Sequence, residues 1–213
     1  MRLEPTTLHG RHVRLEPLSL SHAPALLAAA DHDRSTYGYT PVPDSLERME
    51  AYINGLLADA ERDSAKPFAQ VRTVDDTPVG CTRYLNMLWW PDRTTPAEVE
   101  IGGTWLSADA QRTPINTEAK FLLLQHAFED LRVFRVAIMT DALNARSRAA
   151  IERLGATFEG IVRKHRPNAG SLTPAGQPRN TAAYSIIDDE WPIVRDRLAA
   201  RLRHGTGGEA GVF

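Results

Sequence analysis

One stretch of the chain, between Glu98 and Gly160, constrains the fold more than any other part of the sequence. Its predicted elements, in chain order, are a strand over 99–106, a loop over 111–117, a helix over Glu118–Leu131, a strand over 133–139, a helix that starts at Asn144 and ends at Gly155, and a strand from 157. The first helix shows apolar residues at helical spacing, and the run after it is rich in β-formers. A helix start beneath a loop with free backbone amides is a ready binding site for a phosphate group.

The rest of the chain reads as further strands and helices around this stretch. The strand from 157 is expected to run to 166. The remaining expected elements are a strand over 12–18, helices over 19–30 and 45–62, a β-hairpin of strands 68–74 and 79–89, a strand over 180–187, and a helix over 188–204. We therefore expect about seven strands in one domain over residues 1–204. Residues 167–178 read as a loop, and residues 205–213 have little to bury and read as a flexible tail.

Composition narrows the class of protein. The chain has 213 residues, 42% of them hydrophobic, and can bury a core without disulfides or metal. Its formal net charge of −2, with acids and bases interspersed, predicts no binding to nucleic acid. No apolar run reaches the length of a membrane helix and no signal peptide is recognisable, so we expect no membrane insertion. The single cysteine, Cys81, favours the cytoplasm, and the scattered histidines predict no metal site.

The central stretch also carries three short motifs in a fixed order. They are Glu100-Ile101-Gly102, the loop that begins at Gln111, and Asn144-x-x-Ser147 followed by residues 151–156. Together they resemble the GNAT superfamily of N-acetyltransferases, and in particular the branch named for ribosomal-protein N-terminal acetyltransferases. The resemblance implies an α/β (mixed α+β) fold with a splayed mixed sheet flanked by helices. It also implies an enzyme that moves an acetyl group directly from acetyl-CoA to an amine, which is a protein N-terminus or a small molecule.

The resemblance implies a set of residues for acetyl-CoA, and this chain departs from the family pattern within it. The implied residues are Trp105, Leu106, Gln111, Arg112, Thr113, Ile115, Asn116, Thr117 and Asn144. Pro114 and Asn116 stand where the family loop has small residues, and proline has no backbone N–H to offer a phosphate. Thr113 and Pro114 can equally be read as the N-cap and first residue of a helix, and both readings can hold together.

Glu100 and Ser147 are the catalytic candidates. The resemblance favours Glu100 as the base or substrate-orienting group; the alternative is that it points outward or pairs with an arginine across the sheet, because an unpaired carboxylate among apolar residues is costly. Glu98 shares its face and could divide the role. Ser147 lies on the helix face of Ile151, so it faces inward, where the resemblance places a hydroxyl near the sulfur of coenzyme A. Alternatively, Ser147 bonds its own backbone, and Asn144 caps this helix.

Five aromatic residues could line a pocket for the acceptor, although core packing is the commoner use of such rings. They are Tyr37, Tyr39, Trp89, Trp90 and Trp105. Adjacent strand residues point to opposite faces, so one ring of Trp89 and Trp90 should lie near the surface. These tryptophans and the abundance of arginine suggest a homodimer. A different class is left open by Pro114: a non-catalytic acyl-CoA-binding or interaction protein with a GNAT fold and a degenerate pyrophosphate loop.

Overall fold

The computed structural model describes residues 3–168, 170, 172 and 177–204. Its centre is a sheet of eight strands in the order β1-β2-β3-β4-β5-β6-β8-β7. The strands are β1 (Leu8–His9), β2 (Val13–Pro17), β3 (Ala65–Arg72), β4 (Thr77–Leu88), β5 (Glu98–Leu106), β6 (Arg135–Asp141), β7 (Thr157–Pro167) and β8 (Pro178–Ile187). Only β5 and β6 are parallel. The sequence predicted seven of these strands and missed β1, which is two residues long. The predicted tail over 205–213 and part of the 167–178 loop lie outside the described residues.

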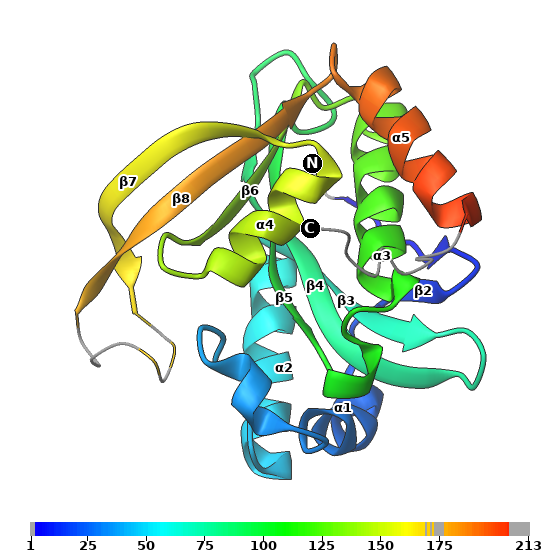
Figure 1. The fold of residues 1–213 in the computed structure, drawn as a ribbon, viewed down its shortest axis with the longest axis vertical. Coiled ribbons are helices and arrows are strands. Elements are labelled where there is room, and N and C mark those ends of the chain that lie inside the picture. The colour runs from blue at the N-terminus through cyan, green and yellow to red at the C-terminus, as the bar shows by residue number, and fades with distance from the viewer. Residues whose placement is uncertain (1–2, 169, 171, 173–176, 205–213) are drawn as a thin grey trace, which may run out of the picture.

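Five α-helices cover the two faces of this sheet. They are α1 (Ala23–Ala30), α2 (Leu46–Glu61), α3 (Pro114–Gln125), α4 (Ala145–Leu154) and α5 (Trp191–His204). Residues of α1 and α2 pack with Ala69, Cys81 and Trp105 in one core cluster. Residues of α3, α4 and α5 belong to the other cluster, with Tyr84 and Ile101. Figure 1 shows α3 beside α5, and α1 together with α2 at the other end of the molecule.

The sequence of β5 explains why it forms the middle of the sheet. Val99 and Ile101 are buried against α3, and Glu100 between them faces the opposite side, as alternation along a strand requires. After the two glycines at 102 and 103, Trp105 is buried against α1 and α2. The strand is therefore covered on both faces, with one carboxylate placed in an otherwise apolar layer.

The start and end of α3 differ from the prediction. The helix begins at Pro114, not at Glu118, because Thr113 is its N-cap: the Thr113 hydroxyl accepts from the Ile115 amide at 3.3 Å. It does not run as an α-helix to Leu131 either. It changes at His126 into one π-helical turn, closed by the bond from the Leu131 amide to the His126 carbonyl. The predicted end of α4 is confirmed, since Gly155 adopts a left-handed φ of 98°.

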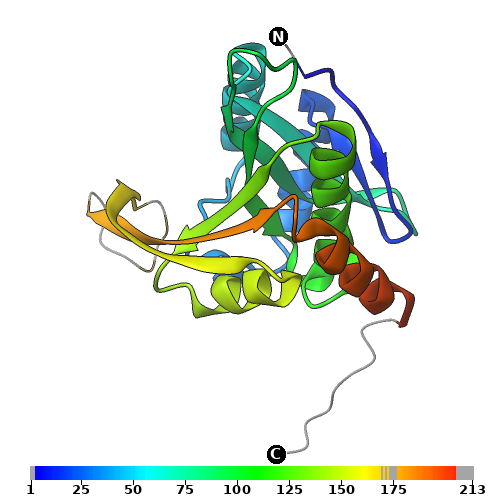
Figure 2. The ribbon, with the colours of Figure 1, turned by 90° about the horizontal axis from the view of Figure 1, so that it is seen from above.

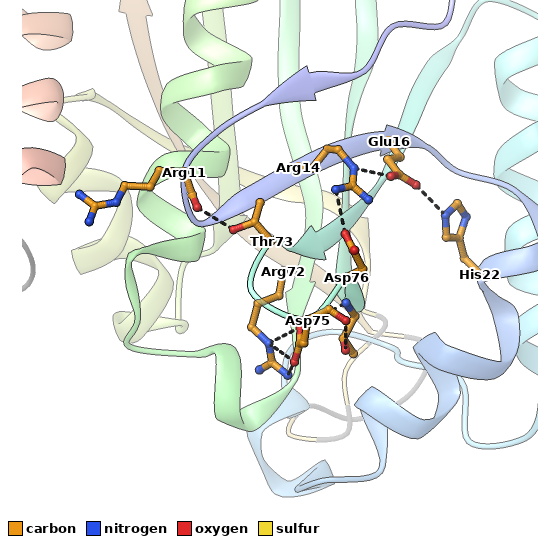
Figure 3. A network of polar contacts seen from close by, with 9 residues as sticks. Arg11, Arg14, Glu16, His22, Arg72, Thr73, Asp75 and Asp76 are labelled. Carbon is orange, nitrogen blue, oxygen red and sulfur yellow. Dashed lines mark hydrogen bonds and ion pairs between the residues drawn. The ribbon is translucent and has the colours of Figure 1, made fainter.

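Polar side chains fasten the outer strands together. Arg14 of β2 lies 2.5 Å from Glu16 and 3.0 Å from Asp76 in the β3–β4 turn. Arg72 binds Asp75 in the same turn, and the Thr73 hydroxyl donates to the carbonyl of Arg11 (Figure 3). Each such exposed pair contributes at most about 1 kcal/mol. Their joint effect is to fix the β3–β4 turn against β2, where sheet pairing alone ends.

β7 and β8 form a long hairpin that projects from the body of the molecule (Figures 1 and 2), and we call this hairpin the arm. Most residues of β7 are exposed. Beyond the end of β7, the amide of Leu172 donates to the carbonyl of Gly38 at 3.1 Å, so the tip returns to the connection between α1 and α2. Within the described residues, no helix is long and apolar enough to cross a membrane.

Candidate active site

The two parallel strands at the centre of the sheet part from each other halfway along. Their pairing runs from Glu98 with Arg135 to Ile101 with Ile138 and stops there. β5 continues to Leu106 along β4, and β6 continues to Asp141 along β8. Over these last residues the described part of the chain places no strand between the two facing edges. Backbone amides and carbonyls at these edges are therefore available to a ligand that enters between the strands.

A glycine bulge shapes β5 where it leaves β6. Gly103 has a φ of +57°, and the register with β4 shifts between Cys81 and Arg83. A Cβ atom at Gly103 would lie 2.5 Å from the guanidinium carbon of Arg83. Both the dihedral angle and the close approach require glycine here. The bulge thus turns the end of β5 and places Arg83 beside the point where the strands part.

The starts of α3 and α4 lie on either side of this opening and are joined by side chains. Arg146 Nη2 donates to Gln111 Oε1 at 2.7 Å. Gln111 Nε2 donates to the carbonyl of Leu106 at 2.8 Å and lies 3.2 Å from the Thr36 hydroxyl. Arg112 is exposed, with a left-handed φ of 61°. Two arginines and two helix starts therefore surround one site, which favours an anion.

The structure tests one of the two readings of the loop before α3. The helix-start reading is confirmed, because Thr113 caps the helix and Pro114 is its first residue. The amide of Ile115 is engaged by Thr113, and its side chain is buried in the core. Asn116 and Thr117 are half-buried in the first turn. Their contact with a cofactor, like that of Gln111, Arg112 and Thr113, stays a prediction.

Glu100 is not a free carboxylate. Its side chain is buried, accepts from Asn86 Nδ2 at 2.7 Å, and pairs with Arg166 of β7, whose Nη2 lies 2.8 Å from Oε2. The alternative reading, an arginine partner from across the sheet, is confirmed. Glu98 pairs separately with Arg135 at 3.3 Å. Oε2 therefore has two close donors, and Oε1 lies 3.4 Å from Arg166 Nη1. A carboxylate engaged in this way is better suited to positioning than to accepting a proton.

At the start of α4 the capping reading is confirmed. The side-chain oxygen of Asn144 accepts from the Ser147 amide at 3.0 Å. Ile151 and Leu154 are buried, and Ser147 is half-buried at the outer end of the same face. The Asn144 amide nitrogen and the Ser147 hydroxyl remain candidates for contact with a ligand between the strands, and these roles stay predictions.

Two of the five aromatic residues serve the core instead of a pocket. Tyr37 and Trp105 are buried edge to face, with ring centroids 5.9 Å apart. The ring of Trp105 therefore points away from α3, and only its backbone lies on the strand edge. Tyr39 donates to the carbonyl of Leu143, which ties the α1–α2 connection to the residues before α4. Trp90 is half exposed, as predicted for one of the two adjacent tryptophans.

Two functional candidates on α3 escaped the sequence analysis. Lys120 is buried and donates to the hydroxyls of Thr82 at 3.1 Å and Thr104 at 2.5 Å, and burial lowers its pKa to about 7. Glu118 accepts from the amides of the three residues 11–13. The sequence did contain a sign that Glu118 is buried, because Glu118 falls three residues after the apolar Ile115, on the same helix face. The predicted helix began at Glu118 and left Ile115 in the loop, so the shared face of the two residues was overlooked.

Known proteins of one family resemble this chain in sequence. Residues 12–157 match the family model described as an acetyltransferase (GNAT) domain. The YdaF protein of Bacillus subtilis (strain 168), named as a candidate ribosomal N-acetyltransferase, is 34% identical over 89 residues, which are 42% of this chain and 45% of that protein. The match thus spans less than half the length of this relative.

Solved structures resemble the whole chain. A crystal structure of a candidate acetyltransferase from T. thermophilus is 37% identical, covers 95% of this chain and 100% of its own, and has a TM-score of 0.78. Mycobacterium smegmatis RimJ, in complex with CoA-disulfide, shares the fold at 21% identity, with a TM-score of 0.75 over 92% of this chain and 94% of its own. The mixed α/β fold predicted from the sequence is confirmed. With a family model that spans most of its length, the chain belongs to the GNAT acetyltransferase family.

Proposed function

We propose that this protein is an N-acetyltransferase that moves an acetyl group directly from acetyl-CoA to an amine. The observation that carries the proposal is the parting of β5 and β6 beside two helix starts joined by Arg146 and Gln111. A thioester arm between the strand edges and a pyrophosphate at the helix starts match this arrangement in charge and in hydrogen-bonding groups. Family membership supports the same reading.

The residues present fit such a co-substrate. Arg112 and Arg146 supply positive charge, and the Asn116 amide lies in the first turn of α3, where backbone donors have no partner within the helix. Proline at 114 removes one donor, and the Thr113 cap engages another. The arginine side chains compensate for these two losses. With this compensation the proposed anion site tolerates its proline.

Acetyl transfer requires a donor to the developing oxyanion, a proton for the departing thiolate and an oriented acceptor amine. The amine nitrogen attacks the thioester carbonyl, a C–N bond forms, the C–S bond breaks, the amine gives up a proton to solvent water, and the thiolate gains one. A backbone amide near Trp105 or Leu106 can hold the oxygen that becomes negative. In this proposal Ser147 supplies the proton to the thiolate. Glu100, held by Arg166 and Asn86, orients the acceptor.

We infer that the acceptor is a protein N-terminal amine. Support comes from the name of the Bacillus subtilis relative, a candidate ribosomal N-acetyltransferase. The face that Glu100 occupies is bordered by the arm, whose tip contacts Gly38 in the α1–α2 connection. A chain terminus can enter between such borders, with its amine directed to the edge of β5. We place the protein in the cytoplasm, where its buried free Cys81 stays reduced.

The test is acetyl transfer to peptides with free N-termini, followed by the release of coenzyme A thiol. Transfer that is lost when the N-terminus is blocked supports the proposal. A non-catalytic acyl-CoA-binding protein is the second candidate, favoured by the engaged Ile115 amide and by Pro114. In that case acetyl-CoA raises the melting temperature and no amine in a broad screen releases the thiol.

We propose that the protein is a homodimer. Trp90 is 50% exposed, its ring lies 5.2 Å from that of Phe134, and the Arg93 guanidinium lies 4.4 Å above Phe134. Exposed aromatics with arginine are typical of interface centres. Light scattering at micromolar concentration tests this: a mass near the 23.6 kDa of one chain, with and without acetyl-CoA, would rule the dimer out.

A further inference from the structure

Two side-chain donors on β8 are buried without a hydrogen-bond partner. They are Nε of Arg179 and the hydroxyl of Thr181, and neither atom has a partner within the part of the chain that the structure describes. The two residues are two apart on one strand and therefore share a face. Buried donors of this kind are costly unless something accepts from them. This pair is an observation that the fold by itself does not explain.

The charges around Arg179 also leave it without a close negative partner among the described residues. Arg179 lies directly opposite Arg166 in the pairing of β7 with β8, and like charges in that position destabilise a sheet. Arg166 is compensated by its ion pair with Glu100. Arg179 receives only longer-range attraction from Asp141 and Glu100, and burial together with Arg166 lowers its pKa. An arginine guanidinium stays charged in proteins, and among the described residues no carboxylate forms an ion pair with this one.

These groups lie on the acceptor side of the sheet. Glu100 is paired with Leu85, and Gly102 with Arg83, so their side chains share the face opposite α3. Asp141 is paired with Thr181, and this brings β8 to the same face. The groups gathered there are the guanidiniums of Arg83, Arg166 and Arg179 and the carboxylates of Glu100 and Asp141. One Asp141 oxygen already accepts from the Leu143 amide at 2.8 Å.

We propose that the acceptor carries a carboxylate close to its reacting amine, and that Arg179 and Thr181 bind this carboxylate. For a protein acceptor this means an aspartate or glutamate within the first few residues of the N-terminus. The carboxylate accepts from Arg179 Nε and the Thr181 hydroxyl, and it gives Arg179 a directly bound negative partner. An acceptor with extra positive charge, such as a polyamine, meets the same arginines and is disfavoured.

This inference rests on the proposed N-acetyltransferase function, and it adds a substrate class to it. The experiment uses matched peptides with glutamate or glutamine at the second, third or fourth position and otherwise identical sequences. Two quantities are measured for each pair: kcat/KM for coenzyme A release, and binding of C-terminally labelled peptides by fluorescence polarisation without acetyl-CoA. The expected result is one position at which the glutamate peptide is preferred about tenfold or more in both measurements.

Variants of the protein then assign the preference to its residues. Arg179→Gln and Thr181→Val should remove or reduce the preference by raising KM for the glutamate peptide, with kcat little changed. Arg179→Lys keeps the charge and should retain part of the preference. Arg153→Gln, an exposed arginine of α4, is the matched control for the loss of one positive charge and should leave the preference intact.

The outcomes separate this inference from the proposed function. If acetyl groups reach glutamate and glutamine peptides equally well at every position, the carboxylate site is wrong and the transferase activity stands. If acetyl-CoA binds but no peptide is acetylated, both the peptide acceptor and the carboxylate site are wrong. A glutamate preference that survives Arg179→Gln would show that other residues bind the carboxylate, and it would overturn the assignment.

Discussion

The Arg146 guanidinium at the start of α4 donates to the side-chain oxygen of Gln111, 2.7 Å away, in the loop that precedes α3. Because Gln111 also binds the carbonyl of Leu106, this one amide side chain links the end of β5 to the starts of two helices. A phosphate group bound there would compete with Gln111 for the guanidinium. The loop and α4 therefore respond together to an anion.

Arg146→Gln should weaken acetyl-CoA binding by up to about fivefold, the size expected for one exposed charge pair. Turnover at saturating acetyl-CoA should change little, because the pyrophosphate lies far along the molecule from the thioester. Isothermal titration and initial rates measure the two quantities. Arg201→Gln on α5 removes one positive charge elsewhere and is the control. Equal affinities for Arg146→Gln and wild type would place the pyrophosphate away from α4.

Glu100→Gln should lower kcat/KM by about the same factor at every pH, because Asn86 and Arg166 already engage the carboxylate. A base would behave differently: its loss costs most below the pKa of the amine, where a proton must be removed. Rates over a range of pH distinguish the two cases. Arg166→Gln is the companion variant, and it should reproduce the loss if the pair acts as one positioning unit. A loss concentrated at low pH would reinstate Glu100 as the base.

Ser147→Ala should reduce kcat roughly tenfold to a hundredfold and leave acetyl-CoA affinity nearly unchanged, as expected for a group that acts on the departing thiolate. Alanine keeps the backbone amide that Asn144 caps, so α4 should remain folded. Single-turnover rates and thermal melting check both statements. Ser147→Thr retains the hydroxyl and should recover part of the rate. Wild-type turnover in the alanine variant would remove Ser147 from the mechanism.

Lys120→Met should stabilise the protein near neutral pH and lose this advantage as the pH rises. The folded pKa of Lys120 is about 7, below the value of about 10.4 for a free lysine. Between these values the unfolded chain binds more protons, so the wild type gains up to about 1.4 kcal/mol of unfolding free energy per pH unit from this residue. The methionine variant lacks that gain.

Urea unfolding of the wild type and the variant over this pH window measures the difference. The exposed lysine at 164 provides the control, since Lys164→Met should shift stability by a constant amount or not at all. A difference between wild type and Lys120→Met that stays constant with pH would mean that Lys120 remains charged in the folded protein.

The sequence predicted the elements that its hydrophobic pattern controls. Seven strands, five helices, the Asn144 cap and the Gly155 end of α4 all follow from local signals. The length of α3 did not follow, because one π-helical turn at His126 shifts the helical register without any local mark in the sequence. The two-residue strand β1 is too short to show an alternating pattern.

The candidate site was harder to predict for a physical reason. Glu100 was found because its motif is local, but its partner Arg166 is 66 residues away, and only the bend of the arm brings the two together. Lys120 of α3 is a second example, because its partners Thr82 and Thr104 lie on two strands that are distant from it in the sequence. Motifs identify residues, whereas long-range packing decides whether a carboxylate is free or an ammonium is buried.

The arm has a consequence for how long Glu100 stays shielded. Strands with few buried contacts exchange their amide protons through local opening, at a lower free energy than the centre of a sheet. β7 is such a strand, and Arg166 lies near its far end. A local opening of the arm would separate Arg166 from Glu100 and expose a carboxylate that is only 3% accessible in the structure. The exposure of Glu100 to solvent therefore depends on how often, and for how long, this edge strand opens.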